Sequence, residues 1–171
     1  METFGSWLRT HLMDDDDVGD QLYLLAKQPC STILTFKGYE INGNTFYTFA
    51  QDQKSTNQNS GVRFDAATDK ERKDTYYGYI DEIWELHYGP NLKVPLFRCK
   101  WVKLTGVKVD EQYGMTTVDL KNLGYLDEQF VLAKDVAQVF YVKDMDSKPK
   151  RKRHKSTTST TRAWEAANRI T

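Results

Sequence analysis

The densest group of acidic side chains in the strand-like part of the sequence is formed by Asp81, Glu82 and Glu85. Metal-assisted phosphoryl transfer requires carboxylates that converge on divalent ions. Successive residues of a strand point to opposite faces, so Asp81 and Glu85 are expected on one face and Glu82 on the other. The group is therefore interpreted as solvated surface charge and not as a catalytic centre.

The sequence also lacks residues arranged for nucleophilic catalysis or for metal binding. Cys99 stands between Phe97 and Trp101, which is typical of an inert core thiol. The other cysteine and the three histidines are scattered without ligand spacing or a neighbouring base: Cys30, His11, His87 and His154. No glycine-rich phosphate loop occurs. The sequence predicts a protein that is not an enzyme and holds no metal or cofactor.

Aromatic residues make up 13% of the chain. An exposed ring attracts cations and stacks on planar bases, so it can cage a methylated lysine or hold a nucleic acid. The candidate binding aromatics are Tyr76, Tyr77, Trp84 and Tyr88. For Trp84 and the nearby Trp101 the alternative is core packing, which their alternation with charged neighbours favours. Of the adjacent tyrosines, the one that faces outward is the better surface candidate.

A basic run near the C-terminus carries the other candidate function. Its charged side chains are Lys148, Lys150, Arg151, Lys152, Arg153 and Lys155. Such a run is typical of a nuclear import signal, read by an import receptor, or of a nucleic-acid patch; a merely solubilising tail is the alternative. Phosphorylation of the hydroxyl residues that follow, 156–161, would cancel much of this charge, which is a hypothesis about regulation.

The net charge of zero hides a division along the chain. Residues 1–144 hold 16 Lys and Arg against 22 Asp and Glu, whereas residues 145–171 hold 8 against 2. Affinity for a phosphate backbone comes mainly from basic side chains, so unspecific attraction to DNA or chromatin is expected in the tail. An apolar leader and any long apolar stretch are absent, which predicts neither secretion nor membrane insertion.

The elements that would position these residues are mostly strands. Apolar and polar residues alternate from Ile33 to Ile41, and Asn42-Gly43 predicts a tight turn into a second strand over 45–49. Residues 76–88 and 93–103 form the longest strand signals, joined by a Gly-Pro-Asn turn. Residues 51–60 are expected to form a polar surface loop, and further strands are expected over 61–64, 116–120, 130–133 and 138–142.

The two ends of the chain have a different character. Helical spacing of Phe4, Trp7 and Leu8 and a second apolar stripe up to residue 28 predict a helical arm. The run Asp14–Asp17 is interpreted as the start of a helix. A divalent-metal site is the more specific alternative. Residues 162–170 are expected to form a short helix. We therefore predict a helical arm over 1–29, a β domain over 30–144 and a disordered basic tail over 145–171. The fold class is mainly β, a compact antiparallel barrel or rolled sheet.

A series of segments in this order resembles one family. They are Trp7 with Leu24-Leu25-Ala26, Tyr39-Glu40-Ile41-Asn42-Gly43 with Phe46, Gln58-Asn59-Ser60-Gly61-Val62, Tyr76-Tyr77-Gly78, Ile80 to Leu86 with Tyr88, Leu96-Phe97-Arg98-Cys99-Lys100-Trp101, Gly106 to Asp110, Phe130-Val131-Leu132-Ala133 and Gln138-Val139-Phe140-Tyr141-Val142. Over residues 4–144 the chain resembles the plant domain of unknown function near the C-terminal end of CACTA (En/Spm-type) transposase proteins. Asn44-Thr45 and Gln129 depart from the family's common pattern, which affects the expected loop geometry.

The resemblance implies a non-catalytic, transposase-associated domain. It implies assembly with other transposase-type proteins or nucleic-acid contact in the nucleus. A fainter likeness connects the strand order from Tyr77 to Leu132 with bromo-adjacent-homology domains, which are chromatin-associated β modules. This likeness implies the alternative function, a chromatin reader that binds a histone tail through surface aromatics.

Overall fold

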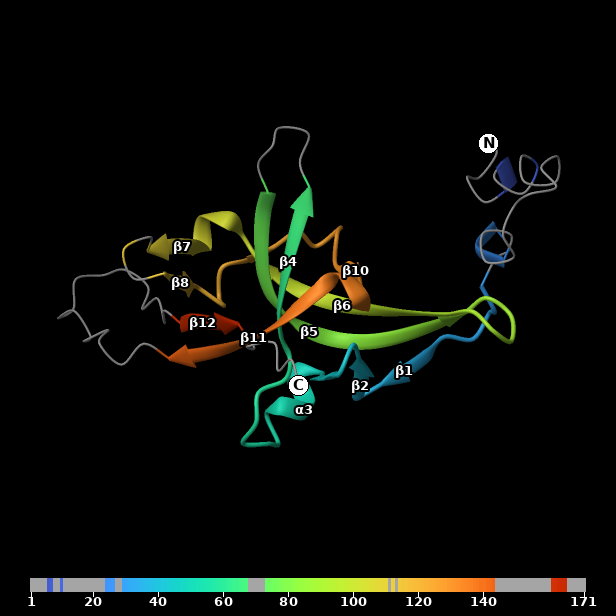
Figure 1. Ribbon diagram of the computed structural model, residues 1–171, viewed down its shortest axis with the longest axis horizontal. Helices are drawn as coiled ribbons and strands as arrows, with labels where there is room; N and C mark the ends of the chain where they lie inside the picture. The colour runs from blue at the N-terminus through green and yellow to red at the C-terminus, as the bar shows by residue number, and fades with distance from the viewer. Residues whose placement is uncertain are drawn as a thin grey trace.

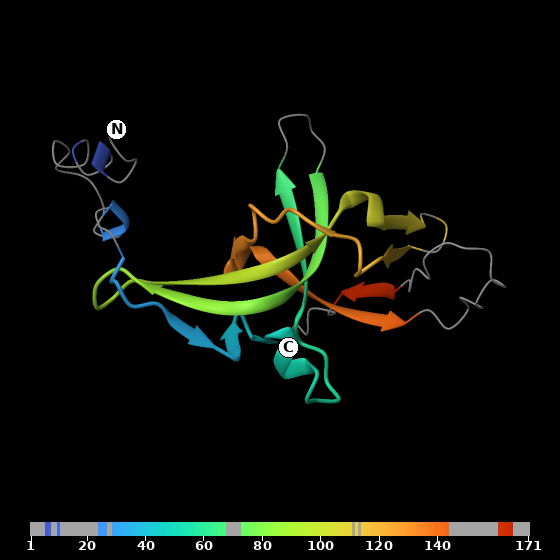
Figure 2. The ribbon, with the colours of Figure 1, turned by 180° about the vertical axis from the view of Figure 1, so that it is seen from behind.

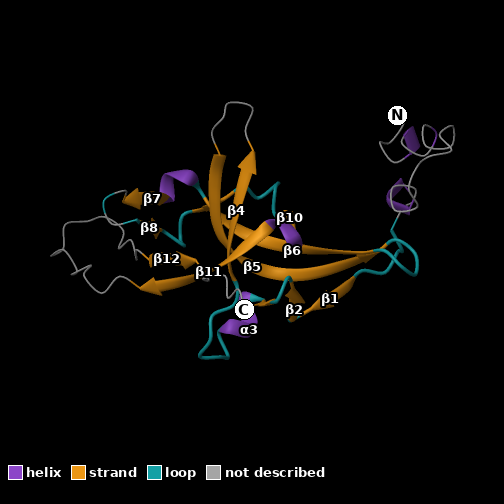
Figure 3. Cartoon of the chain, viewed as in Figure 1, coloured by secondary structure: helices purple, strands orange, loops and turns teal. Residues whose placement is uncertain are grey.

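The computed structural model describes residues 6–7, 10, 24–26, 29–67, 73–110, 112, 114–143 and 161–165. Strands dominate these residues (Figures 1 and 3), which confirms the prediction of a mainly β protein. The strands are β1 (Leu34–Phe36), β2 (Gly38–Ile41), β3 (Asn44–Tyr47), β4 (Gly61–Ala67), β5 (Lys73–His87), β6 (Lys93–Val102), β7 (Val107–Asp110), β8 (Met115–Val118), β9 (Leu123–Gly124), β10 (Phe130–Leu132), β11 (Val136–Lys143) and β12 (Thr161–Glu165). Short helices lie between them: α3 (Phe49–Asp52) and the single 3-10 turns η1 (Leu104–Gly106) and η2 (Ala133–Asp135).

Ten of the strands form one antiparallel sheet with two free ends. Its order is β10-β6-β5-β4-β11-β12-β8-β7, with β1 also paired to β5 and β9 to β6. Because β10 and β7 do not pair with each other, the sheet is open, and the barrel alternative of the predicted fold class is wrong. The sheet nevertheless curls, since the three residues of η2 connect β10 to β11, which three other strands separate within the sheet.

The long strand β5 bends the sheet by changing partners along its length. Its first part pairs with β4 over residues 73–79 and its last part with β1 over residues 83–85, while β6 pairs with it over residues 78–87 (Figure 2). The register with β6 shifts between Ile80 and Glu82, so Asp81 is the extra residue of a β-bulge. A bulge bends its strand and turns the following side chains to the other face.

The main core lies between this bent hairpin and the separate hairpin β2–β3. Phe46 of β3 packs on Phe97 of β6, with ring centroids 5.1 Å apart, and both rings are buried. Cys99, Trp101 and Ile83 lie in the same cluster. The inward placement predicted for residues 97, 99 and 101 is confirmed. Trp84, for which core packing was favoured, is only half-buried, because the bulge places it on the outer face.

The first hairpin forms as its turn residues predict, although the strand before it is divided. Asn42 and Gly43 have φ values of 51° and 73°, the left-handed conformation that a tight hairpin turn requires. Residues 33–41, expected as one strand, are split at Lys37, because β1 pairs with β5 whereas β2 pairs with β3. The side chains alternate without a break over this segment, but its two halves pair with different strands, and this pairing divides it.

The polar segment 51–60 is exposed over residues 53–58, as expected of a surface loop, but it has a buried anchor. Oδ2 of Asp52 accepts hydrogen bonds from the backbone N–H groups of Asn59 at 2.9 Å and Ser60 at 2.7 Å. These bonds close the loop onto the end of α3. The other oxygen, Oδ1, is buried without a hydrogen-bond partner among the described residues, so the two backbone donors offset only part of the cost of burying this carboxylate.

Residues 161–165 form a strand and not the expected helix. β12 pairs with β11 on one side and with β8 on the other. A helix of nine residues is marginal by itself, whereas this segment finds backbone partners on both edges. Residues 166–170 of the helix predicted near the C-terminus lie outside the described residues. The same holds for the acidic run Asp14–Asp17 and for the basic run Lys148–Lys155. Within the described part of the chain, no helix has the length and apolar character needed to cross a bilayer.

Candidate functional site

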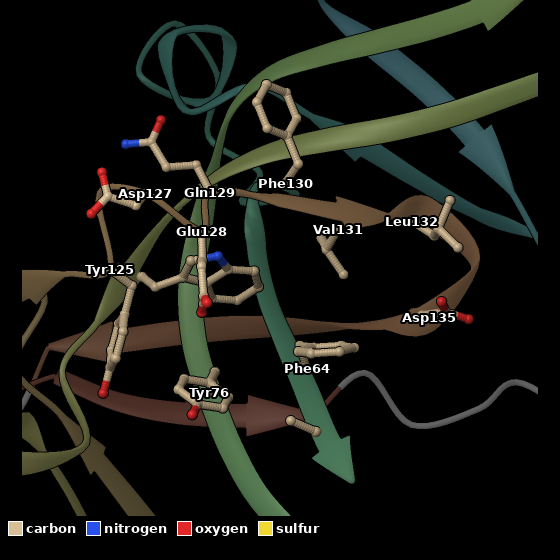
Figure 4. Close-up of a pocket in the computed structure, with 12 residues that line it drawn as sticks. Phe64, Tyr76, Tyr125, Asp127, Glu128, Gln129, Phe130, Val131, Leu132 and Asp135 are labelled. Carbon is tan, nitrogen blue, oxygen red and sulfur yellow. The ribbon is translucent and has the colours of Figure 1, made fainter. Parts of the chain in front are cut away.

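A pocket of about 550 Å³ opens where β10 approaches the bent part of β4 and β5. Four strands, η2 and the segment 125–129 contribute its walls (Figure 4). The lining residues are Phe64, Ala66, Tyr76, Trp101, Tyr125, Asp127, Glu128, Gln129, Phe130, Val131, Leu132 and Asp135. Its size lies within the range of ligand pockets, about 300–1,000 Å³.

Aromatic rings form the floor and one side of this pocket. The rings of Tyr76 and Tyr125 meet edge to face, with centroids 5.4 Å apart and an interplanar angle of 87°. Phe64 and Trp101 form a second pair with centroids 6.3 Å apart. The face of an aromatic ring carries negative potential, so a ring exposed in the pocket can attract a cation.

Acidic side chains complete the pocket. Asp127, Glu128 and Asp135 line it, and none of its lining residues is basic. Burial raises the pKa of Tyr76 above its usual value, and Tyr125, Asp74 and Glu128 add to this effect. The phenol therefore stays neutral and presents its ring. Together the carboxylates and rings favour a ligand that is positively charged and partly apolar.

A strained turn holds the rim of the pocket in place. Tyr125 has a φ of 56°, a left-handed conformation that non-glycine residues rarely adopt. Its carbonyl accepts a hydrogen bond from the N–H of Glu128 at 3.1 Å, and its hydroxyl accepts one from the N–H of Leu104 at 3.4 Å. Backbone strain of this kind persists where the surroundings impose it, and it is concentrated at functional sites.

The four candidate binding aromatics do not come together in one site. Tyr76 lines the pocket, whereas Tyr77 is buried in a second core cluster with Val118 and Val139. Trp84 lies on the outer face, and Tyr88 stands at the far end of the hairpin, where its N–H donates to the carbonyl of Leu92. The outward member of the tyrosine pair is thus Tyr76.

Several pocket residues carried no clear signal in the sequence. Phe64 and Tyr125 stand in segments read as a short strand and an unassigned stretch, and Asp127 and Glu128 resemble ordinary surface acids. Gly124, a residue type common at turns, is the one local signal near Tyr125. The six basic residues of the candidate import signal lie outside the described residues, so the structure does not relate them to the pocket.

The carboxylates of Asp81, Glu82 and Glu85 on β5 are not arranged as the alternation of a regular strand predicts. Nη2 of Arg98 lies 2.9 Å from Oδ2 of Asp81 and 2.6 Å from Oε1 of Glu82, so the bulge brings these two acids to one partner. Glu85, expected on the same face as Asp81, instead reaches Tyr39. The shared face of residues 81 and 85 is therefore wrong, because the bulge changes the alternation between them.

The buried thiol has the environment of a core residue. Cys99 is buried, and burial raises the pKa of its thiol far above its usual value, with a smaller contribution from the charge of Asp81. A thiol that stays protonated is a poor nucleophile. Among the described residues, no group of three His, Cys, Asp or Glu side chains could hold a metal ion.

Comparison with known proteins gives one partial match. Residues 84–153 are similar to the family model described as a domain of unknown function (DUF4216), and this segment runs from the second half of β5 past the end of β11. It includes the pocket residues contributed by β6, β10, η2 and the 125–129 turn, whereas Phe64, Ala66 and Tyr76 lie before it. No curated protein and no solved structure matches the chain.

Proposed function

We propose that this chain is a non-catalytic binding module that takes a methylated lysine of a basic peptide, such as a histone tail, into its aromatic pocket. The observation that carries the proposal is one pocket in which the rings of Phe64, Tyr76, Trp101 and Tyr125 combine with three carboxylates, with no basic side chain among the described lining residues. This is the chromatin-reader function, the alternative suggested by the aromatic content of the sequence.

Methylation suits a lysine to this pocket for a physical reason. A methylated ammonium keeps its charge but is less strongly hydrated, so it loses less on leaving water. Aromatic faces then attract it by about 0.5–2 kcal/mol at each well-placed ring. The carboxylates of Asp127, Glu128 and Asp135 add long-range attraction, which also raises the rate of association with a basic peptide.

The transposase-associated origin forms a second part of the proposal. The match of residues 84–153 supports similarity to a domain of unknown function, which is the general part of the resemblance. We infer that the chain derives from CACTA-type transposon proteins, is imported into the nucleus through its basic run and can assemble there with transposase-type proteins. The separation of charge favours an auxiliary DNA contact through residues 148–155, since the acidic body repels phosphate.

Titration with peptides tests the pocket. The probes are one basic peptide with its central lysine unmethylated, monomethylated, dimethylated or trimethylated, and the readout is the fluorescence of the full chain, because Trp101 lines the pocket. The expected result is affinity that increases with methylation and falls by about tenfold or more in Tyr76→Ala. The matched control is Tyr88→Ala, which removes a tyrosine outside the pocket. Affinity independent of methylation, or equal loss in both variants, would overturn the proposal.

The DNA contact requires a different variant. Truncation after residue 144 would also remove β12, which is part of the sheet. We therefore choose a full-length chain in which the six Lys and Arg residues of 148–155 are replaced by Gln. Salt-dependent DNA binding that disappears in this variant supports the contact, and DNA binding that persists unchanged contradicts it.

A further inference from the structure

The strand β10, which forms one wall of the pocket, is also one end of the sheet. On its inner side the N–H of Cys99 donates to the carbonyl of Gln129 at 2.8 Å, and residues 129 and 99 stand opposite each other in the register. Hydrogen-bonded and non-hydrogen-bonded pairs alternate along an antiparallel ladder. The N–H groups of Phe130 and Leu132 therefore point away from β6, toward the open edge.

The side chains of β10 separate two surfaces. Val131 is 8% exposed and points toward Phe64 in the pocket, whereas Phe130 points the opposite way (Figure 4). Phe130 and Leu132 are 48% and 37% exposed on the outer face, where Phe130 packs against Trp84 with ring centroids 4.7 Å apart. A strand added at this edge would alternate in the same way.

We infer that the ligand of the pocket is an extended peptide that adds a strand to the free edge of β10. The residue opposite Val131 carries the cation and enters the pocket. Its two neighbours are apolar and pack on Phe130 and Leu132. The partner is thus a segment of the pattern apolar-cation-apolar, held by its backbone as well as by its charge. This inference rests on the proposed function, because it uses the same pocket.

A basic peptide fits this edge better than a second copy of the chain. Antiparallel pairing of two β10 strands would place Val131 opposite Val131 and bring two acidic rims, each with Asp127 and Glu128, close together. The negative charges of the two rims would repel each other. The edge is only three residues long, which suits a short peptide whose affinity comes mainly from one anchored side chain.

A scan of backbone N-methylation tests the added strand. The probe is a seven-residue peptide with trimethyllysine at its centre and leucine on both sides, methylated at one amide at a time. Alternate amides of an added strand face β10, so methylation should weaken binding at every second position, about threefold to tenfold for each lost hydrogen bond. The phase of the pattern shows whether the peptide runs parallel or antiparallel to β10.

A pair of protein variants provides the matching test. Leu132 has a φ of −65°, the value that proline requires, and its N–H lies on the open side, so Leu132→Pro removes this donor without strain. Leu132→Ala shortens the side chain but keeps the N–H. The proline variant should bind the peptide about threefold to tenfold more weakly than the alanine variant. Because both variants lose the leucine side chain, which lines the pocket, the ratio of their peptide affinities, and not their difference from wild type, reports the N–H group.

Two further outcomes separate the inference from the proposed function. If tetramethylammonium and the peptide bind but the N-methylation scan is flat, the added strand is wrong and the cation pocket stands. If neither probe binds, both are wrong. Replacement of the flanking leucines by aspartate should also weaken binding, and an unchanged affinity would contradict the apolar flanks.

Discussion

The rings of Tyr125 and Tyr76 meet edge to face at a centroid distance of 5.4 Å, although 48 residues stand between them in the chain. The contact joins the turn after β9 to the first half of β5. It closes the aromatic side of the pocket and depends on the left-handed backbone of Tyr125. Each member of the pair can be altered separately.

The first prediction concerns the ring of Tyr76. Tyr76→Ala should weaken binding of a trimethyllysine peptide by about tenfold or more, because a cation loses one aromatic face. Tyr76→Phe should retain most of the affinity, since the face is kept. Isothermal titration calorimetry of the two variants checks this, with circular dichroism as the control for folding. Equal losses in the two variants would show that the hydroxyl, and not the ring, matters.

The second prediction concerns the buried carboxylate Glu85. Its side chain is 6% exposed; Oε2 accepts a hydrogen bond from the hydroxyl of Tyr39 at 2.6 Å, and Oε1 lies 2.7 Å from Nε2 of His87. Glu85→Gln should lower the free energy of unfolding by about 1–3 kcal/mol at pH 7, because the amide replaces one of the two acceptor oxygens by an NH2 group. Urea denaturation measures the loss. The control is Glu40→Gln at the exposed position of β2, which should change stability by no more than about 0.5 kcal/mol.

The pH dependence of stability follows from the same carboxylate. Burial tends to raise the pKa of Glu85, but hydrogen bonds from Tyr39 and His87, with the charge of Lys93, outweigh it and leave the pKa below its usual value. A lowered folded-state pKa contributes stability that is fully present above the unfolded-state pKa and is lost as the pH falls through the folded-state pKa. Wild type should therefore lose more stability than Glu85→Gln on acidification below about pH 4.5. Parallel curves would contradict this assignment.

The third prediction concerns the close approach of β5 and β6 at Gly78. A Cβ atom at this position would lie 2.4 Å from the carbonyl oxygen of Lys100, and the carbonyl of Gly78 also accepts a hydrogen bond from the hydroxyl of Tyr141 at 2.8 Å. Gly78→Ala should destabilise the fold by about 2–3 kcal/mol, since backbone must move to make room. Thermal denaturation measures this. The comparison variant Gly114→Asn lies in open space, and its cost should be below about 1 kcal/mol, because asparagine tolerates the left-handed φ of 62° at this position better than most residues do.

The fourth prediction concerns the two thiols. Cys30 is exposed and Cys99 is buried, so a thiol reagent should modify one cysteine quickly and the second only after denaturation. Cys30→Ser should abolish the fast phase and leave the slow one. Two fast phases in the native protein would show that the core around Phe97 and Trp101 opens readily.

The fifth prediction concerns β12. A chain that ends at residue 144 loses a strand that pairs with both β11 and β8, so it should be less stable than the full chain by more than about 2 kcal/mol. Replacing the basic residues of 148–155 by Gln should leave stability nearly unchanged. Equal stability of the truncated and full-length chains, measured by urea denaturation, would show that β12 adds nothing to the sheet.

Local patterns in the sequence determined the strand content, the turn at Asn42-Gly43 and the inward positions of Phe97, Cys99 and Trp101. These features depend on the preferences of single residues and on the two-residue period of a strand, both of which operate over short distances. They identified the hairpin β5–β6 but not the course of the sheet around it.

Only the tertiary structure decided which side chains share a site. One extra residue at Asp81 turned Trp84 to the outer face and brought Glu82 to Arg98, and no local pattern marks a bulge of this kind. The pocket likewise combines Phe64, Tyr76 and Tyr125 from separate segments. Their meeting depends on how the sheet curls, which is set by long-range backbone pairing. The same pairing made a strand of residues 161–165, for which the local sequence favoured a helix.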